Sequence, residues 1–311
     1  MHPIRHAKAL VRERVTELVR SEVRAEMRTT VTVATQVFEA RQADAGRLAS
    51  TYDHTKTPSD EFYSVLADRL QGAGVHVQTK QVDVARFSDW VEAHPGLWDY
   101  YYGDPATRGE KLLEHYLAEE STHLSAGMTY IDVAAAGGRW VSCLRDSGLN
   151  ALALDLSYPQ GVHGWRIGAD AQEIPLPSGS VDAMSAQCAF ECFQGGADVG
   201  FMREAARLLR TGGRLAIVPL YVDDTHFITT SPYTVVDRDR FDESAAVVWR
   251  DDEYDEPFDR HYSPEALVDR LGDTLGLFSE ARVVHMTNLE SLRERWPGSR
   301  LYAYFLLECR K

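Results

Sequence analysis

The sequence predicts an α/β fold in which a mostly parallel sheet of seven strands carries helices on both faces. Two observations predict it: strand-like and helix-like segments alternate from about residue 107, and helical stretches separate most of the strands. Alternation of this kind places the strands side by side in a sheet that is covered on both faces. The expected strands are Thr129–Ala134, Leu149–Asp155, Trp165–Ala169, Val181–Gln187, Leu215–Val222, Ala281–Met286 and Leu301–Leu307.

Four helices are expected around these strands. One precedes the alternation at residues 105–122, and the others are Trp140–Asp146, Val199–Leu209 and Pro264–Leu275. Ser263 is a suitable N-cap because its hydroxyl can accept from a free amide and Pro264 would occupy the first helical position. The last two strands lack a full helix between them, which predicts that one of them runs antiparallel.

Residues 1–106 form a separate region in this interpretation, followed by the main domain at residues 107–311 with an acidic insert at 222–256. Residues 1–50 show apolar side chains at three- and four-residue steps, which predicts a helix. Such a helix must bury its stripe on the main domain, as a packing arm or lid, or on a second subunit, as a homodimer helix. The pattern does not decide between these two.

Residues 51–106 are mixed. Ser59 is a possible cap for a helix that starts near Asp60, and the segment from Val75 alternates like a strand. An aromatic cluster follows, which would shape a substrate pocket or form satellite core. Its members are Trp90, Trp98, Tyr100, Tyr101 and Tyr102.

Composition excludes several classes of protein. With 44% hydrophobic and 26% charged residues the chain has the balance of a soluble globular protein. No apolar run is long enough for a transmembrane helix, and the N-terminus lacks a signal-peptide pattern. The four cysteines form no CxxC pair, so we expect a reducing cytoplasm. The formal net charge of −14 argues against nucleic acid and against an anionic membrane surface.

The segment YIDVAAAGGRW, residues 130–140, ends a hydrophobic strand in small residues and opens a helix. A ligand can approach a backbone there because few side chains block it. Asp155 ends the next strand, seventeen positions after Gly138, where a carboxylate can accept hydrogen bonds from ribose hydroxyls. Asp170 follows the third strand and could accept from an adenine amino group.

This order of motifs resembles the class I S-adenosylmethionine-dependent methyltransferases of the small-molecule branch. The first motif of the family reads here as Asp132, Ala134, Ala136 and Gly138, and the second is matched by Asp155. Residues 169–176 and 209–215 resemble two further motifs. The resemblance implies a Rossmann-like domain that transfers the methyl group of S-adenosylmethionine to a small molecule. It implies cofactor contacts at Asp132, Ala134, Ala136, Gly138, Asp155, Leu156, Asp170, Ala171 and Gln187.

Two alternatives stay open. Ala134 and Ala136 replace glycines of the family pattern, and alanine is costly wherever φ is positive. An inactive protein with this fold that serves as a partner subunit would carry such changes. The acid after the second strand also suits a nicotinamide-dependent oxidoreductase, although Ala136 is unfavourable for a pyrophosphate.

Candidate catalytic residues follow the fourth and fifth strands, because ligands of open α/β sheets bind beyond the carboxyl ends. They are Glu191, as a positioning carboxylate, and His226 and His261, as general bases. Asp223 and Asp224 with His226 would be an alternative divalent cation site, but no metal is expected. Cys188 and Cys192 are expected to be small buried thiols. The insert has eleven acidic residues against three arginines, which suits either a cap for a cationic or polyhydroxyl acceptor or a solvated loop.

Overall fold

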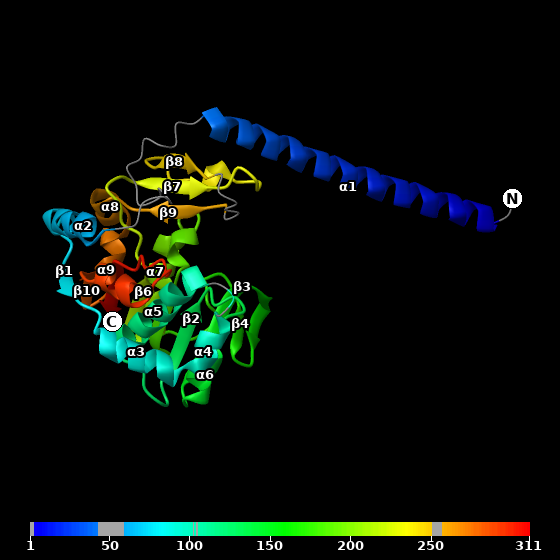
Figure 1. Ribbon diagram of the computed structural model, residues 1–311. Helices are drawn as coiled ribbons and strands as arrows, with labels where there is room; N and C mark the ends of the chain where they lie inside the picture. Colours follow the sequence, from blue (N-terminus) through cyan, green and yellow to red (C-terminus); the bar gives the residue numbers. More distant parts are fainter. Residues whose placement is uncertain (1–2, 43–58, 102, 104, 251–256) are drawn as a thin grey trace.

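The computed structural model describes residues 3–42, 59–101, 103, 105–250 and 257–311. In this part of the chain an eight-stranded sheet has the order β1-β10-β11-β6-β5-β2-β3-β4, and a three-stranded sheet has the order β8-β7-β9 (Figure 1). The main strands are β1 (Val77–Lys80), β2 (Thr129–Val133), β3 (Asn150–His163), β4 (Arg166–Gly168), β5 (Val181–Gln187), β6 (Leu209–Val218), β10 (Glu280–Met286) and β11 (Phe305–Arg310).

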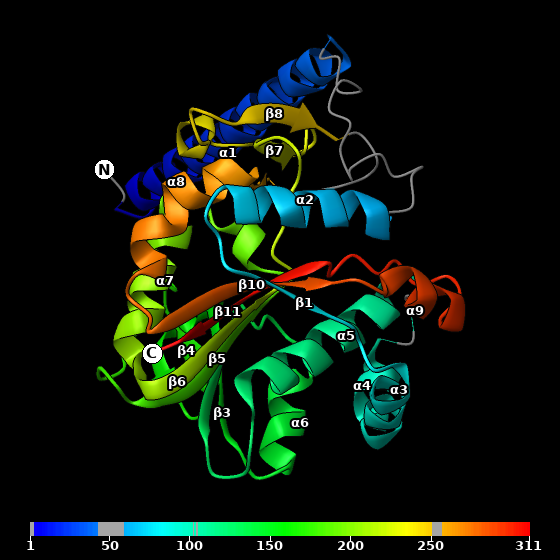
Figure 2. The same ribbon diagram turned by 90° about the vertical axis from the view of Figure 1, so that its left-hand side faces the viewer.

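Helices cover both faces of the main sheet, which confirms the predicted fold class (Figure 2). In this view α2 and α8 lie on one side of the sheet and α3 to α6 on the other. The α-helices are α1 (Pro3–Gln42), α2 (Asp60–Gly72), α3 (Val84–Ala93), α4 (Pro95–Tyr100), α5 (Pro105–Thr122), α6 (Trp140–Asp146), α7 (Ala197–Leu208), α8 (Pro264–Leu275) and α9 (Leu289–Arg295). The predicted caps are present, because Ser59 Oγ accepts from Phe62 N at 3.2 Å and Ser263 Oγ accepts from Ala266 N at 3.1 Å.

Strand β11 runs antiparallel to both of its neighbours, as predicted, although the short helix α9 lies between β10 and β11; the other ladders of the main sheet are parallel. The sheet has eight strands rather than seven because β1, from the N-terminal region, pairs in parallel with β10. The last strand begins at Phe305 instead of Leu301. The residues before it have other partners: the Leu301 carbonyl accepts from Arg293, and Tyr302 N donates to Glu110 Oε2.

No helix lies between β3 and β4, although helices follow β2 and β5 in the expected way. Asp155 and Gln160 both lie beside Gly168 in the register, so the four residues between them pass close to Gly168. A Cβ built on Gly168 would lie only 2.0 Å from the Pro159 carbonyl oxygen. The chain therefore makes a close backbone approach at the end of β4, next to the predicted cofactor residue Leu156.

The acidic insert contains most of a second sheet, which we call the cap sheet: β7 (Phe227–Thr230), β8 (Ala246–Trp249) and β9 (Asp259–His261). Residues 251–256 of the insert lie outside the described residues. Buried Asp198 of α7 anchors the cap sheet, since it accepts from Tyr262 Oη at 2.7 Å and lies 3.1 Å from Arg260 Nη1. The cap sheet is thus a packed structure and not a solvated loop.

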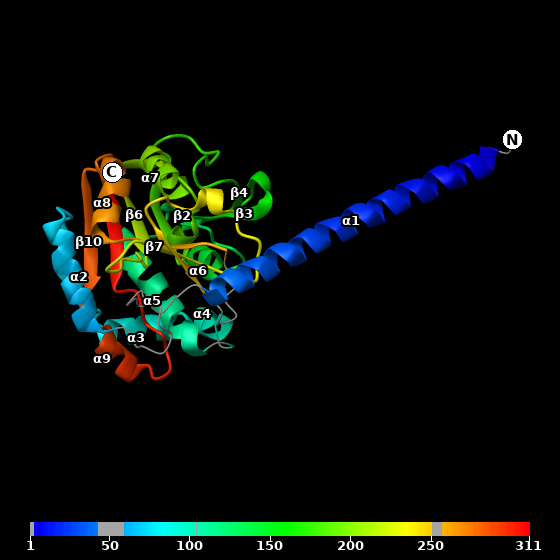
Figure 3. The same ribbon diagram turned by 90° about the horizontal axis from the view of Figure 1, so that it is seen from above.

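Helix α1 extends away from the rest of the molecule (Figures 1 and 3). The prediction of a helix over residues 1–50 is confirmed for Pro3–Gln42, and residues 43–50 lie outside the described residues. Its end contacts the insert through the ion pair of Glu39 with Arg238. Its exposed apolar side chains are Val19, Val23, Met27, Val31 and Phe38. None of the described helices combines the length and apolar character that crossing a membrane requires.

We expect Gly168→Ala to lower the free energy of unfolding by roughly 1–3 kcal/mol, because the added Cβ would force the Pro159 backbone to move. Gly72→Ala is the matched control, since a Cβ there meets nothing within 4 Å at the end of α2. Urea denaturation of both variants measures the difference. Equal midpoints for the two variants would show that residues 156–159 do not pack against β4.

Candidate functional site

The loop after β2 holds its alanines in left-handed backbone conformations. Ala134 has φ of 56° and Ala136 has φ of 45°, so the positions that would be glycine in the family pattern do require positive φ. Two contacts hold Ala136: its N–H donates to Asp155 Oδ2 at 2.8 Å, and its carbonyl accepts from the Tyr158 hydroxyl. The backbone shape that the small residues predict is therefore present despite the alanines.

The predicted cofactor residues meet at one edge of the sheet. They lie in or directly after β2, β3, β4 and β5, which are neighbours in the order β5-β2-β3-β4, and Asp155 and Leu156 lie within β3 because that strand continues to His163. Strand β2 lies between β3 and β5, and the strand order reverses at this point. Connections that diverge on the two sides of β2 leave a crevice at its carboxyl end. Gly138 lies at the start of α6, where its N–H donates to the Ala135 carbonyl at 3.1 Å.

Asp155 already accepts three hydrogen bonds from the chain. Oδ1 accepts from Ser157 N at 2.8 Å and from Ser157 Oγ at 2.6 Å, in addition to the Ala136 bond to Oδ2. A carboxylate has about four acceptor sites. One site therefore remains for a ribose hydroxyl, and Leu156, with 77% of its surface exposed, stands beside it.

Asp170 is exposed and accepts from Gln172 N at 2.9 Å, which fixes the turn after β4. Its other oxygen lies 3.2 Å from the Gln172 side-chain amide, and Ala171 is half-buried between them. This side chain still faces solvent and can accept from an amino group.

Gln187, at the end of β5, is the centre of a buried network. Its amide donates to Ser185 Oγ at 2.8 Å and to Asp132 Oδ1 at 3.3 Å, while its carbonyl lies 2.5 Å from His115 Nδ1. The His115 Nε2 atom lies 3.0 Å from the Tyr101 hydroxyl. This network joins α5 and the aromatic cluster to the strand that begins the cofactor loop.

Burial controls the protonation of this network. It raises the pKa of Asp132 to about 7, against the opposing effect of hydrogen bonds from Ser185 and Gln187. Burial also lowers the pKa of His115 to about 3, so its ring is neutral. Sequence reasoning missed His115, although its four-residue spacing from Lys111 on a helix that precedes the first strand was a usable signal.

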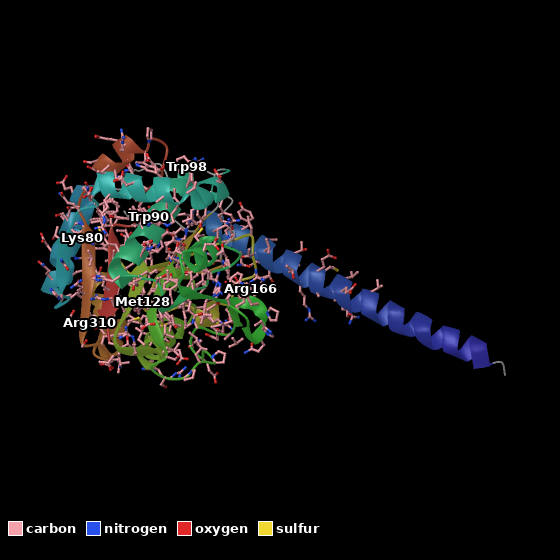
Figure 4. The ribbon with its side chains drawn as sticks, turned by 90° about the horizontal axis from the view of Figure 1, so that it is seen from below. Lys80, Trp90, Trp98, Met128, Arg166 and Arg310 are labelled. Atoms are coloured by element: carbon pink, nitrogen blue, oxygen red, sulfur yellow. The ribbon has the colours of Figure 1, made fainter. Side chains whose placement is uncertain are left out.

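The aromatic cluster divides into two parts. Tyr100 donates to the Gly137 carbonyl at 3.4 Å and Tyr101 contacts His115, so both border the cofactor loop. Trp90 and Trp98, of α3 and α4, lie away from Arg166 of β4 (Figure 4). Trp90 contacts Tyr116 and Trp140, and Trp98 contacts Trp296 after α9. Trp98 lines a surface cavity of about 630 Å³. Tyr102 lies outside the described residues.

A second polar cluster lies beyond the carboxyl ends of β5 and β6, and we call it the acceptor-side cluster. Its members are Glu110, Lys111, Glu114, Cys188, Glu191, Tyr221, Asp259, His261 and Tyr302. Lys111 Nζ lies 3.0 Å from Glu114 Oε2 and also bonds the Cys188 thiol. Cys188 has φ of 48°, and this turn brings Glu191 of the short 3₁₀ helix Phe190–Cys192 into the cluster.

Glu191 is almost fully buried, with 5% of its surface exposed. Burial, followed by the nearby Asp259 carboxylate, raises its pKa to about 8. Its Oε2 atom has no hydrogen-bond partner in the described part of the chain. A buried carboxyl group of this kind can hold or accept a proton near neutral pH.

The two candidate histidines lie close together but differ in their contacts. His226 Nδ1 lies 2.8 Å from the His261 carbonyl and Nε2 lies 3.3 Å from Asp242 Oδ2, so both ring nitrogens face protein partners. His261 is buried between Phe227 and Tyr221, with ring centroids at 4.4 and 4.8 Å. His226 thus ties the cap sheet together, whereas His261 faces the acceptor-side cluster.

Within the described residues, no group of three His, Cys, Asp or Glu side chains is arranged to hold a metal ion. Asp223 and His226 have separate partners: Asp223 Oδ2 lies 4.0 Å from His261 Nδ1, and His226 pairs with Asp242. Cys192 is half-buried and forms no disulfide, and burial raises the pKa of the Cys188 thiol well above its usual range.

Comparison with known proteins identifies the class. Residues 131–217 match a family model described as a methyltransferase domain, and the search of curated proteins found no match. With the strand order and the loop described above, this match shows that the chain carries a class I S-adenosylmethionine-dependent methyltransferase domain, whose cofactor is S-adenosylmethionine.

Several solved structures are similar. The Burkholderia thailandensis 1,6-didemethyltoxoflavin-N1-methyltransferase, solved with its substrate and S-adenosylhomocysteine, is 14% identical over 83% of this chain and 92% of that chain, with a TM-score of 0.43. An S-adenosylmethionine-dependent methyltransferase from Methanosarcina mazei is 14% identical over 60% and 94%, with a TM-score of 0.39. The YcgJ protein from Bacillus subtilis is 21% identical over 35% and 51%, with a TM-score of 0.31, so the chain spans about half of its length.

We expect Asp132→Asn to change how stability depends on pH. The raised pKa means that the folded state favours protonated Asp132, and this contribution is lost as the pH rises through about 7. Between pH 5 and pH 8 the wild type should therefore lose roughly 2 kcal/mol relative to the variant. Urea denaturation at four pH values measures this, and a constant difference would contradict the buried-carboxyl interpretation.

Proposed function

We propose that the protein is an enzyme that transfers a methyl group from S-adenosylmethionine to a small-molecule acceptor. The observation that carries the proposal is the position of the acceptor-side cluster, which lies after β5 and β6, next to the cofactor crevice after β2 and β3. The bound cofactor would supply a methyl group on a positively charged sulfur, which is already an activated donor. The protein then contributes mainly placement of the acceptor and exclusion of water.

The residues of the crevice suit this cofactor. The loop at residues 134–138 consists of alanine and glycine, so no side chain extends beyond Cβ. Asp155 keeps one acceptor site for a ribose hydroxyl. Asp170 is exposed at the end of β4 to accept from the adenine amino group. Asp132 and Gln187 hold the strand ends through their mutual hydrogen bond and act on the cofactor through the loop.

Among the candidate catalytic residues, Glu191 is the one we assign to the acceptor, as proton acceptor and positioning group. Its unpartnered, buried Oε2 supports this role. His261 is assigned to the wall of the acceptor site, because its ring lies between Tyr221 and Phe227. His226 is assigned to cap stability, since both of its nitrogens have protein partners.

A small acceptor suits the burial of the cluster, in which Glu110, Glu191 and His261 each expose 5% of their surface or less. The four cysteines are free, which supports the proposal of a reducing, cytoplasmic compartment. The formal net charge of −14 supports the absence of nucleic acid among the substrates.

The first test is calorimetric titration with S-adenosylhomocysteine, with NADH as a control ligand. We expect micromolar binding of the first and none of the second. Asp155→Ala should weaken binding roughly tenfold or more, because it removes a charge-assisted contact and the bond that holds Ala136. Asp89→Ala, an exposed acid on α3, should bind as the wild type does.

If neither ligand binds, the left-handed alanines have closed the crevice and the partner-subunit alternative replaces an enzyme. If NADH alone binds, the protein is an oxidoreductase. Equal affinity of Asp155→Ala and wild type would remove Asp155 from the cofactor site.

We also propose that α1 pairs two copies of the chain. The proposed division assigns it to the N-terminal region, residues 1–106, beside the domain at 107–311. Its exposed apolar stripe supports pairing, because a helix that leaves the molecule must cover such a stripe elsewhere. Sedimentation equilibrium should give a dimer for the wild type and a monomer for Val23→Glu with Val31→Glu. Ala25→Glu, on the opposite face, should stay dimeric, and a monomeric wild type would contradict the proposal.

A further inference from the structure

Two buried carboxylates of the acceptor-side cluster each keep one oxygen without a hydrogen-bond partner among the described residues. These oxygens are Oε1 of Glu110, which is fully buried, and Oε2 of Glu191. The other Glu110 oxygen accepts from Tyr302 N at 2.9 Å, and Glu191 also bonds the Cys188 thiol. Unpartnered carboxylate oxygens in such positions are costly, because burial removes their water without a replacement.

Two cations act on these carboxylates, and each has another partner. Lys111, which acts on both, lies 3.0 Å from Glu114. Arg293, which acts on Glu110, donates to the Leu301 carbonyl at 2.8 Å and to the Tyr304 hydroxyl at 2.9 Å. The group closest in effect to Glu191 is another acid, Asp259, which raises the pKa of Glu191 after burial itself.

A cation from outside would stabilise the ionised form of Glu191 and give its Oε2 atom a partner. An alcohol or phenol would bring no charge, and a carboxylate would add to the repulsion. An ammonium group brings one positive charge and up to three N–H donors, which match unpartnered carboxylate oxygens.

We propose that the methyl acceptor is a primary or secondary amine, which enters as its ammonium form and donates an N–H to Glu191 Oε2. The proposal rests on the proposed function, and it names the substrate class of the same site. Glu191 has Asp259, Lys111 and Cys188 as neighbours, and Lys111 is paired with Glu114.

Glu191 then takes one proton from the bound amine. The N–H bond breaks with its electron pair left on nitrogen, and an O–H bond forms at Glu191 Oε2. The amine becomes neutral and gains the lone pair that a nucleophile needs, and no other reactant is consumed. A carboxyl group whose pKa lies near 8 is suited to this exchange at neutral pH.

The test titrates three matched probes into protein saturated with S-adenosylhomocysteine: phenethylamine, 2-phenylethanol and 3-phenylpropionate. The amine should bind roughly tenfold more tightly than the alcohol, and the acid should bind most weakly. Glu191→Gln should remove most of this preference while the affinity of the alcohol stays nearly constant. Glu243→Gln, an exposed acid of the cap insert, makes the same change in net charge and should keep the preference.

A second measurement needs no variant. At pH 7 most Glu191 is protonated in the free protein, so amine binding should release about one proton. Calorimetry in two buffers with different ionisation enthalpies counts it. Binding of the amine without proton release, or equal affinity of amine and alcohol, would overturn the proposal.

The sulfonium of the cofactor is a second cation with which Glu191 could form an ion pair. If it serves that cation, Glu191→Gln would weaken S-adenosylmethionine more than S-adenosylhomocysteine and leave the amine preference intact, and the amine proposal would be wrong. Failure of S-adenosylhomocysteine to bind the wild type would instead overturn the proposed function itself. The two failures are therefore distinguishable in the same set of titrations.

Discussion

The hydrogen bond from Ala136 N–H to Asp155 Oδ2 is the contact on which the cofactor end of the sheet depends. It joins the loop after β2 to the middle of β3 and holds an alanine at a φ that costs about 1 kcal/mol or more relative to glycine. A charge-assisted bond of this type contributes enough to offset that strain. The start of α6, the crevice and the turn through Ser157 all take their positions from this pair.

A second constraint comes from α5, which carries polar side chains on its buried face. His115 reaches Gln187 and Tyr101, whereas Lys111 and Glu114 reach the end of β5 one helical turn away. The same helix thus supports the cofactor loop and forms one wall of the acceptor side. These contacts join α5 to the aromatic segment before it. Residues before 107 therefore help to position the side chains of the site.

Periodicity and capping chemistry predicted the elements whose residues interact with their near neighbours in sequence. The bounds of α6, α8 and β5 agree with the prediction, and Ser59 and Ser263 cap as their sequence positions indicate. Features that depend on distant partners were not readable. The pairing of β1 with β10 and the contact of His115 with Gln187 depend on residues 72 or more positions away, and the cap sheet pairs residues 19 to 34 positions apart. The predicted end of the second strand at Asp155 is wrong, because β3 continues to His163, and the bonds of Asp155 to Ser157 and Ala136 were not predicted.

The two ends of the cap insert lie side by side, which bears on how such an enzyme changes its acceptor. Val222 and Tyr262 form a bridge, Asp223 N donates to the Tyr262 carbonyl at 2.8 Å, and Tyr262 N donates to the Tyr221 carbonyl at 3.0 Å. The insert therefore leaves and rejoins the domain at a single closed neck. A segment of different length or sequence could replace the insert between these residues if it also kept the contacts of Arg240 and Asp242 with Gly195 and Arg270. Exchange of this segment, in nature or in the laboratory, would change which acceptors bind. The residues around the cofactor crevice would stay the same.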